Sequence, residues 1–448
     1  MFRTACSHGD FAFDFCDSLL RRSRPVAVMI WRGIYITLYV FALPWVLFRL
    51  WWRGRAEPLY RHDIAARFGR WEEAPEAAGV WVHAVSVGET VAAVPLLRGL
   101  EALAPSAPRI LTVTTAAGRE RARDLLGDSV YVTWLPFDLP FSLRAFLRRA
   151  RPRLLVLIET ELRPLLVQEC GRFGVRIVLV NARLSERSAA GYRRLGGLTR
   201  DMLDGIELIA CQDSGSAERF LALGARPERV ICPGNMKFDA LVPGDLSARM
   251  DRARERLGAD DGPLLIAAST HAGEEELLLA ALLPLLRRHP DWRLLIVPRH
   301  AHRFDAVWRL MERSPLACAR LSDGEVPAGS RLLLGDVMGE LMALYGLADV
   351  AFLGGSLLPG GGHNPVEPAW HGLPLFTGPH VDNFADVTER FVMAGALEIV
   401  ANADVLAQAM ERVLDDDALW QRRGDAAREV VEANRGALGA ILAAMRAL

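Results

Sequence analysis

The chain of 448 residues is long enough for two domains, because a single hydrophobic core rarely grows to that size. Hydrophobic residues make up 51% of the chain and charged residues 24%, a balance typical of a globular protein and not of a disordered one. The formal net charge is −1, whereas nucleic-acid-binding proteins are usually clearly basic, so we expect no nucleic-acid partner.

An apolar segment near the N-terminus, residues 26–48, is interrupted only by Arg32. As a helix it would be about 34 Å long at about 1.5 Å per residue, enough to cross the core of a bilayer. Tryptophans suited to the headgroup region lie near its ends, at Trp31, Trp45, Trp51 and Trp52. We expect residues 26–52 to form a membrane anchor, spanning or half-inserted, after an N-terminal extension of residues 1–25. The alternatives are a buried core helix and a cleaved signal peptide, and no small-residue cleavage site supports the latter.

From residue 79 onward, apolar runs rich in Val, Ile and Leu alternate with segments of helical spacing. Apolar runs of this kind are typical of parallel strands covered on both faces, and their alternation with helices predicts a doubly wound α/β sheet. The first series of runs is GVWVHAVS, RILTVTT, VYVTWLPF, LLVLIETEL, VRIVLVNA, IELIACQD and RVICPGN. We therefore expect residues 53–238 to form a first α/β domain.

A polar stretch at residues 239–262 is predicted to be an interdomain linker. The alternation then restarts with LLIAAST, a helix from Glu274 to Arg288, LLIVPR, RLLLGD, VAFLGGS and PLFTGP. Residues 263–448 are accordingly predicted to be a second α/β domain that ends in helices.

Polar residues that follow the predicted strands are candidate site residues, because ligands of open α/β sheets bind at the carboxyl ends of the strands. Ser86, Gly88 and Glu89 follow the first strand, with Glu89 in the first turn of the next helix. A carboxylate that complements the helix dipole is an equally good interpretation of that position. Glu159 and Glu161 follow another strand, where a purely structural network is the alternative.

Four arginines follow the next strand of the first domain: Arg183, Arg187, Arg193 and Arg194. Guanidinium groups bind phosphate well, so this segment is a candidate phosphate-binding surface. A solvated basic face is the alternative interpretation.

The densest group of candidate residues lies in the second domain. Ser269, Thr270 and His271 follow a strand, where Ser269 or Thr270 is expected to cap the next helix, and Arg299 ends another strand. A glycine-rich loop then leads into a helix near Pro365, whose exposed N–H groups suit an anionic phosphate. The candidate residues of this loop are Gly361, Gly362, His363, Asn364 and Glu367. Together they indicate a nucleotide-sugar site.

No metal site or disulfide framework is predicted. The six cysteines are scattered and lack metal-ligand spacing, which favours free thiols in a reducing compartment. Asp415, Asp416 and Asp417 begin a predicted helix away from the candidate site, so we interpret them as capping charges.

With these residues in view, the chain resembles the transferases of Kdo (3-deoxy-D-manno-octulosonic acid) in lipopolysaccharide synthesis. The resemblance runs from about Ile30 to the C-terminus and rests on eight motifs in one order. They are HAVSVGE, NARLSERS, GNMKFD, ASTHAGEE, VPRH, GDVMGELM, GGHNPVEP and GPHVDNF. The chain departs from the family in having Arg163 before Pro164 where Trp is frequent, and Ala301–His302 where Pro-Glu is common.

The resemblance implies two Rossmann-like domains of the GT-B architecture, a membrane-associated N-terminus and no metal or other cofactor. It implies that Glu89 is the general base and that Arg299 and the HNPVEP loop bind the donor CMP-Kdo, with Lys237 and Arg299 stabilising the departing phosphate. Ser86, Gly88, Glu159, Glu161, Arg183 and Arg187 would then bind the acceptor, lipid IVA, at the cytoplasmic face of the inner membrane. The implied reaction inverts the anomeric carbon.

Two other functions remain open at this point. Another two-domain enzyme that uses a nucleotide sugar, such as an epimerase, would need no lipid surface, which the apolar N-terminal segment argues against. A non-catalytic scaffold of the cell envelope would not need Glu89 or the intact HNPVEP loop.

Overall fold

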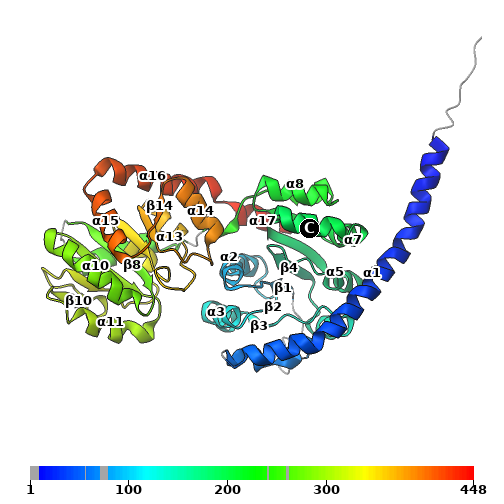
Figure 1. Ribbon diagram of the computed structural model, residues 1–448, viewed down its shortest axis with the longest axis horizontal. Coiled ribbons are helices and arrows are strands. Elements are labelled where there is room, and N and C mark those ends of the chain that lie inside the picture. The colour runs from blue at the N-terminus through cyan, green and yellow to red at the C-terminus, as the bar shows by residue number, and fades with distance from the viewer. Residues whose placement is uncertain (1–9, 56, 71–78, 240–241, 259–261) are drawn as a thin grey trace, which may run out of the picture. The chain divides into compact units, whose positions relative to one another are not determined.

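The computed structural model describes residues 10–55, 57–70, 79–239, 242–258 and 262–448, with side chains from residue 31 onward. The chain divides into two compact units (Figure 1). The first comprises Met1–Met236 and Gly436–Leu448, and the second comprises Lys237–Arg435. Each unit is described by itself.

The first unit is built on a seven-stranded, wholly parallel sheet in the order β3-β2-β1-β4-β5-β6-β7. Its strands are β1 (Val80–His83), β2 (Arg109–Val113), β3 (Tyr131–Trp134), β4 (Leu154–Ile158), β5 (Arg176–Ala182), β6 (Leu208–Cys211) and β7 (Val230–Ile231). The helices after them are α2 (Val87–Leu103), α3 (Ala116–Leu126), α4 (Pro140–Ala150), α5 (Pro164–Arg172), α6 (Glu186–Arg194), α7 (Gly197–Asp204) and α8 (Ser214–Ala222). The inner strands β1 and β4 are almost wholly buried, which explains why their sequences are apolar without alternation.

The second unit repeats this plan with the strand order β10-β11-β9-β8-β12-β13-β14, again parallel. Its strands are β8 (Leu264–Thr270), β9 (Arg293–Pro298), β10 (Cys318–Arg320), β11 (Leu332–Leu334), β12 (Val350–Leu353), β13 (Leu375–Thr377) and β14 (Leu397–Ile399). Its helices are α9 (Leu246–Leu257), α10 (Glu274–Arg288), α11 (Phe304–Met311), α12 (Leu341–Tyr345), α13 (Val366–Trp370), α14 (Ala385–Met393), α15 (Ala403–Leu414) and α16 (Asp417–Asn434). The predicted fold class is confirmed, and α10 has the predicted bounds.

Two parts of the predicted domain organisation differ from the structure. Residues 239–262 are not merely a linker, because they contain α9, whose buried Leu246, Ala253 and Leu257 pack into the second unit. These residues recur at helical spacing, but the many charges between them hid the apolar stripe. The last helix, α17 (Ala437–Arg446), packs with the first unit through buried Ala437 and Ile441 and not with the second domain.

The N-terminal helix α1 (Asp10–Arg53) is longer than the predicted anchor of residues 26–52 and extends into the predicted N-terminal extension. Its segment Trp31–Arg53 has a mean hydropathy of 1.6 and is long and apolar enough to cross a membrane. Tyr35, Ile36 and Leu50 on one side of this segment pack against the core of the first unit, which argues against a helix buried all round.

In each sheet the strand order reverses beside the first strand. The reversal lies between β1 and β4 in the first unit and between β8 and β12 in the second. Such a topological switch point leaves a crevice at the carboxyl ends of the strands, where ligands of open α/β sheets bind. Most candidate residues of both units follow these four strands, whereas Arg183 and Arg187 follow β5 and Arg299 follows β9.

Candidate active site

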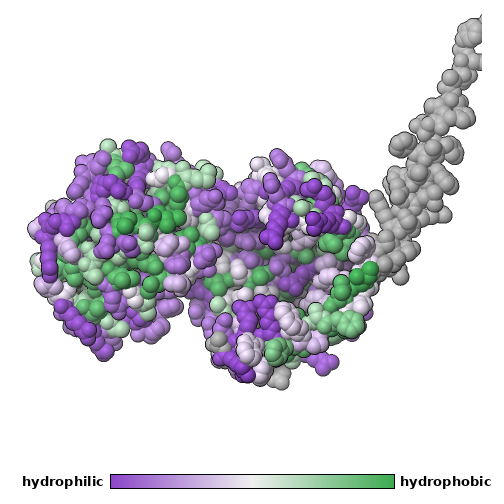
Figure 2. Space-filling model, viewed as in Figure 1, coloured by the Kyte–Doolittle hydropathy of each residue, from purple (hydrophilic) through white to green (hydrophobic). Residues whose placement is uncertain are grey.

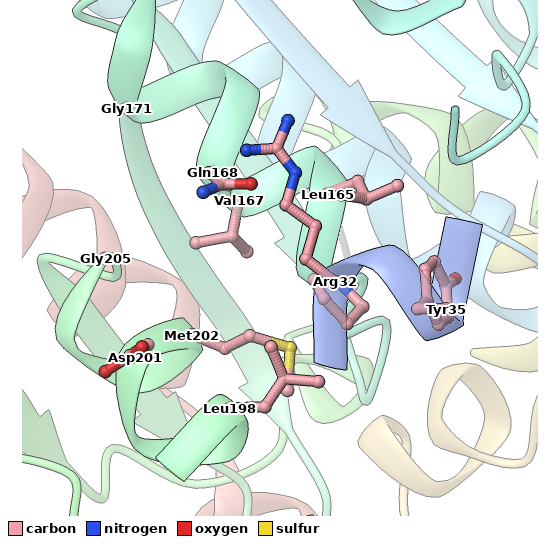
Figure 3. A pocket seen from close by; sticks show the side chains of 11 residues that line it. Arg32, Tyr35, Leu165, Val167, Gln168, Gly171, Leu198, Asp201, Met202 and Gly205 are labelled. Carbon is pink, nitrogen blue, oxygen red and sulfur yellow. The ribbon is translucent and has the colours of Figure 1, made fainter. Parts of the chain in front are cut away.

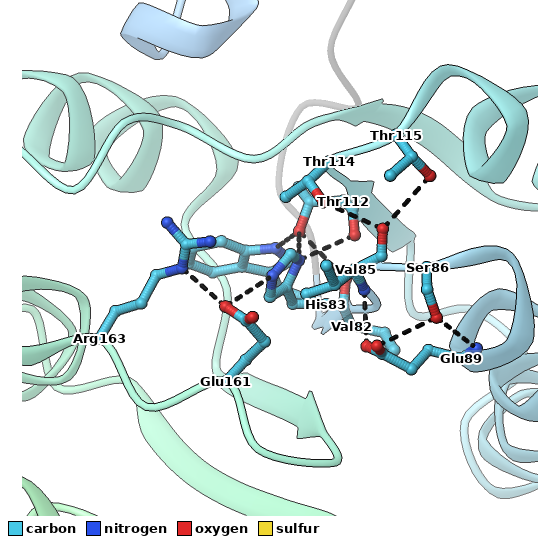
Figure 4. A network of polar contacts seen from close by, with 11 residues as sticks. Val82, His83, Val85, Ser86, Glu89, Thr112, Thr114, Thr115, Glu161 and Arg163 are labelled. Atoms are coloured by element: carbon cyan, nitrogen blue, oxygen red, sulfur yellow. Dashed lines mark hydrogen bonds and ion pairs between the residues drawn. The ribbon is translucent and has the colours of Figure 1, made fainter. Parts of the chain in front are cut away.

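Glu89 lies in the first turn of α2, directly after the tight turn that links β1 to this helix (Figure 4). Its backbone N–H donates a hydrogen bond to Ser86 Oγ at 3.2 Å, which caps the helix. In return, the carboxylate accepts hydrogen bonds from the Val85 N–H at 2.7 Å and from the Ser86 hydroxyl at 3.1 Å. Both interpretations made from the sequence therefore apply, because Glu89 stabilises the helix start and also presents a carboxylate at the sheet's carboxyl edge.

The environment of Glu89 favours its protonated form. Burial, together with the negative charge of Glu159, raises the pKa of Glu89 to about 7, although the hydrogen bonds from Val85 and Ser86 oppose the rise. A carboxylate with a pKa near neutrality suits a general base, because a substantial fraction is ionised at neutral pH and the ionised form binds a proton more firmly than an ordinary carboxylate does.

His83, Glu161 and Arg163 form a second group beside this turn (Figure 4). Nδ1 of His83 lies 2.9 Å from the Thr112 carbonyl oxygen, and its Nε2 lies 3.8 Å from the Glu161 carboxylate, which accepts a 2.8 Å hydrogen bond from Arg163. Burial lowers the pKa of His83 and keeps the imidazole neutral. Burial would raise the pKa of Glu161, but the neighbouring His83 ring and the charge and hydrogen bond of Arg163 outweigh it and lower this pKa to about 2. Glu161 is thus a fixed negative charge, unlike Glu89.

Three non-glycine residues with left-handed backbone conformations follow or end strands of the two sheets. They are Glu159 after β4 (φ 63°), Asn181 in β5 (φ 52°) and Ser269 in β8 (φ 56°). The ladders are irregular at Asn181 and Ser269, where the register with the next strand shifts. Such strained residues concentrate at functional sites, and all three positions carry polar side chains at the carboxyl edges of the sheets.

Asn181 is a structural member of the NARLSERS motif. Its Oδ1 accepts a hydrogen bond from the Met236 N–H at 2.9 Å, and its carbonyl accepts one from Gln212 at 2.9 Å. Arg183 and Arg187 of the same motif have exposed side chains, as do Arg193 and Arg194. Within the described residues none of these four guanidinium groups forms an ion pair, so they remain available to an anion.

An apolar pocket of about 210 Å³ lies between α1, α5 and α7 (Figure 3). Arg32, Tyr35, Leu165, Leu198 and Met202 are among its lining residues. Arg32 also belongs to a cluster in which three guanidinium groups surround the buried Glu169 carboxylate, those of Arg32, Arg144 and Arg172. Three positive charges against one negative charge leave this end of the pocket basic. This pocket could not be predicted from the sequence, since its walls come from separate parts of the chain.

In the second unit a pocket of about 310 Å³ is lined by Ser269, Arg299 and Glu367, together with parts of the GDVMGELM segment. The structure thus brings together three predicted donor-site residues from β8, the end of β9 and α13. Lys237 is not among the residues that line this pocket; its ammonium group lies 3.6 Å from the Asp386 carboxylate.

Glu274 holds the two strand ends of the second switch point together. Its buried carboxylate accepts hydrogen bonds from the backbone N–H groups of His271, Gly355, Ser356 and Leu357, at 2.6–2.9 Å. The expected cap by Ser269 or Thr270 is wrong, because Gly273 is the N-cap of α10 and the Thr270 hydroxyl donates instead to Glu275 at 3.0 Å.

The glycine-rich loop after β12 packs closely against its neighbours. A Cβ atom on Gly354 would lie 2.7 Å from the backbone of Ser269, and one on Gly361 (φ 84°) would lie 2.4 Å from Asn383. Gly362 also has a positive φ of 72°. His363 Nε2 lies 3.1 Å from His271 Nε2, and Asn364 Oδ1 accepts a hydrogen bond from the N–H that begins α13. Among the predicted loop residues, His363 therefore lies beside the end of β8, whereas Gly361 packs against Asn383.

One group of side chains has ligand atoms close enough for a metal ion, namely His289, Glu411 and Asp415, within 4.8 Å of one another. Arg288 donates to both oxygens of Glu411 at 2.8 Å, so this carboxylate is already neutralised by an ion pair. Asp416 caps α16 by accepting a hydrogen bond from Leu419 N–H, as its interpretation as a capping charge predicted.

Two parallel α/β units with polar residues at their switch points define the class of proteins with the GT-B architecture. The solved UDP-GlcNAc 2-epimerase of Neisseria meningitidis has a similar fold, with a TM-score of 0.50 at 13% identity over 82% of this chain and 100% of that chain. The C-terminal CMP-Kdo binding domain of WaaA from Acinetobacter baumannii is 31% identical over 42% of this chain and 97% of that domain, with a TM-score of 0.40.

Comparison with known protein sequences shows the family to which this chain belongs. Residues 62–240 match the family model described as 3-deoxy-D-manno-octulosonic-acid transferase (kdotransferase). The 3-deoxy-D-manno-octulosonic acid transferase of Haemophilus influenzae is 39% identical over 92% of this chain and 97% of that protein. The chain belongs to the 3-deoxy-D-manno-octulosonic acid transferase family, as the motifs indicated, and is a glycosyltransferase.

Proposed function

We propose that this enzyme transfers Kdo from CMP-Kdo to lipid IVA, with inversion at the anomeric carbon, at the cytoplasmic face of the inner membrane. The observation that carries the proposal is the placement of Glu89. In a chain of the Kdo transferase family, a carboxylate with a pKa raised to about 7 lies at the switch point of the first sheet.

In the proposed reaction, a hydroxyl oxygen of the acceptor attacks the anomeric carbon of Kdo from the face opposite the phosphate. The C–O bond to the phosphate breaks, CMP leaves as the monophosphate, and Glu89 takes the hydroxyl proton. The fixed negative charge of Glu161 and the strained Glu159 would position the acceptor beside this base.

CMP-Kdo would bind in the second unit, where Ser269, Arg299 and Glu367 line one pocket. The Arg299 guanidinium would stabilise the charge that develops on the departing phosphate, and the Glu367 carboxylate would accept hydrogen bonds from sugar hydroxyls. Because Lys237 lies beside Asp386, we assign it a role in holding the local structure rather than direct phosphate contact.

An acylated and phosphorylated acceptor suits the first unit. The apolar pocket between α1, α5 and α7 can take part of an acyl chain, and the basic cluster at its edge suits a phosphate. The pocket also adjoins the site, because Pro164 in its wall directly follows Arg163 of the His83 group.

The test is incubation of the full-length enzyme in detergent with CMP-Kdo and lipid IVA, followed by mass spectrometry of the lipid. An added mass of one or more Kdo units supports the proposal, and unchanged lipid IVA together with intact CMP-Kdo contradicts it. Calorimetry with CMP tests the donor site separately. Unchanged CMP affinity in both Arg299→Ala and Glu367→Ala would move that site elsewhere.

A further inference from the structure

The exposed face of α1 is a continuous stripe of large apolar side chains. Seven residues recur at alternating spacings of three and four, and each is at least 43% exposed. They are Trp31, Ile34, Leu38, Phe41, Trp45, Phe48 and Trp52. Figure 2 shows hydrophobic residues gathered on this part of α1. A stripe of this size facing water is unfavourable, so it marks a surface that an apolar partner covers.

The opposite face of the same helix is fixed to the first unit. Residues on this face are only partly exposed, at Arg32, Tyr35, Ile36, Tyr39, Leu43, Val46, Leu47 and Leu50. At the N-terminal end of this segment, Arg32 pairs with the buried Glu169 at 3.3 Å, and the Tyr35 hydroxyl donates to the buried Asp138 at 2.8 Å.

The C-terminal end of the helix is fixed to the same unit. Leu50 packs on its core, the Trp51 carbonyl accepts a hydrogen bond from Arg61 at 3.0 Å, and the Arg53 guanidinium lies 4.9 Å from the Tyr60 ring centroid. From Arg32 to Arg53 the helix rises about 32 Å, the thickness of a bilayer core. If this segment crossed a membrane, one of its ends would lie on the far side, away from the unit that holds both.

Cations and aromatic rings lie together at the C-terminal end of the stripe. The Arg49 guanidinium lies 5.5 Å from the Trp45 ring centroid, and that of Arg55 lies 4.4 Å from the Trp52 centroid. Tryptophan and arginine both favour the headgroup region of a bilayer, where the ring is partly buried and the charge can meet lipid phosphate. This pairing suits a helix at the surface of a membrane.

We infer that residues 31–52 of α1 lie in the plane of the membrane, with the stripe inserted into one leaflet and the opposite face bound to the first unit. The partner is therefore a lipid leaflet, and the segment does not span the bilayer. The inference deepens the membrane location proposed above and rests on it.

Depth measurement by electron paramagnetic resonance tests the orientation. Cys6, Cys16, Cys232 and Cys318 are first replaced by Ser, while the buried Cys170 and Cys211 stay. Nitroxide labels are then placed through Ile34→Cys, Phe41→Cys or Phe48→Cys in the full-length protein on vesicles that contain anionic lipid. Glu218→Cys, on exposed α8, is the control that should remain in water.

An in-plane helix predicts the same shallow depth at all three stripe positions. A label at position 41 that lies about 10 Å deeper than those at 34 and 48, the rise over seven residues, would show a spanning helix and overturn the inference. Water-like accessibility at all three positions would overturn it as well. Kdo transfer in detergent is measured separately, so failure of the proposed reaction is distinguishable from failure of this orientation.

Discussion

Glu89 stabilises the start of α2 and is the proposed general base, and a suitable substitution separates these two roles. Glu89→Gln keeps an oxygen that can accept the Val85 N–H but cannot take a proton. Transfer should fall about 10²–10⁴-fold, the usual loss for a missing general base, while the melting temperature stays close to that of the wild type. The control is Glu120→Gln, an exposed carboxylate on α3. A Glu89→Gln enzyme with more than roughly a tenth of wild-type activity would contradict the role.

The neighbours of Glu89 should move the pH dependence of transfer in opposite directions. The base acts when ionised, so kcat/KM should rise as the pH increases through about 7. Ser86→Ala removes a hydrogen bond that lowers the pKa of Glu89, so the rise should move to higher pH. Glu159→Gln removes a negative charge that raises this pKa, so the rise should move to lower pH. If both variants shifted the pH dependence of kcat/KM in the same direction, a group other than Glu89 would control it.

The positions of individual candidate residues in the fold could be predicted from the sequence better than their contacts. Glu89 and Arg299 each follow an apolar run, and Glu367 follows a glycine-rich loop that leads into a helix, so each could be placed near a sheet edge as a candidate. The approach of His83 to Glu161 could not be predicted, because it depends on β1 pairing with β4 and not with β3. Glu274 was assigned only to a helix start, since three of its four backbone partners come from the distant loop after β12.

At the scale of elements, Glu274 should contribute strongly to stability because it joins α10 to the loop after β12. Glu274→Ala would leave four buried or partly buried N–H groups without an acceptor. Each orphaned donor costs about 1–3 kcal/mol, so the loss of four should lower the free energy of unfolding by at least about 4 kcal/mol in urea denaturation. The matched control is Glu276→Ala, an exposed carboxylate in the same helical turn, which should change it by about 0.5 kcal/mol or less.

Most elements were predictable because buried parallel strands are apolar throughout. The strands missed were the short edge strands β10 and β14, each of which has only one buried residue among three and so lacks such a run. Helix α9 was mistaken for part of a linker because its buried residues are separated by many arginines and acidic residues. Helix α9 packs against α12 in the second unit, and no local sequence pattern indicates this contact.

At the scale of the whole molecule, the sequence predicted an apolar anchor but could not decide how it meets the membrane. That question depends on which face of α1 the first unit occupies. The contacts from Arg32 to Glu169 and from Tyr35 to Asp138 join residues more than 100 positions apart. Such contacts cannot be predicted from local hydropathy, so a helix bound along one side and a membrane-spanning helix have similar sequences.

A charge on the outer stripe should therefore weaken membrane binding without affecting the donor site. Phe41 is 80% exposed on this stripe, and burying such a ring in lipid contributes about 1.5–3 kcal/mol. Phe41→Glu should lower partitioning onto vesicles at least about tenfold, because about 1.4 kcal/mol corresponds to a factor of ten. Met393→Glu is the matched control, since this apolar residue of the second unit is also 80% exposed. Vesicle sedimentation measures the partitioning, and calorimetry should give the wild-type CMP affinity for both variants. Equal partitioning of Phe41→Glu and Met393→Glu would show that the stripe does not contact lipid.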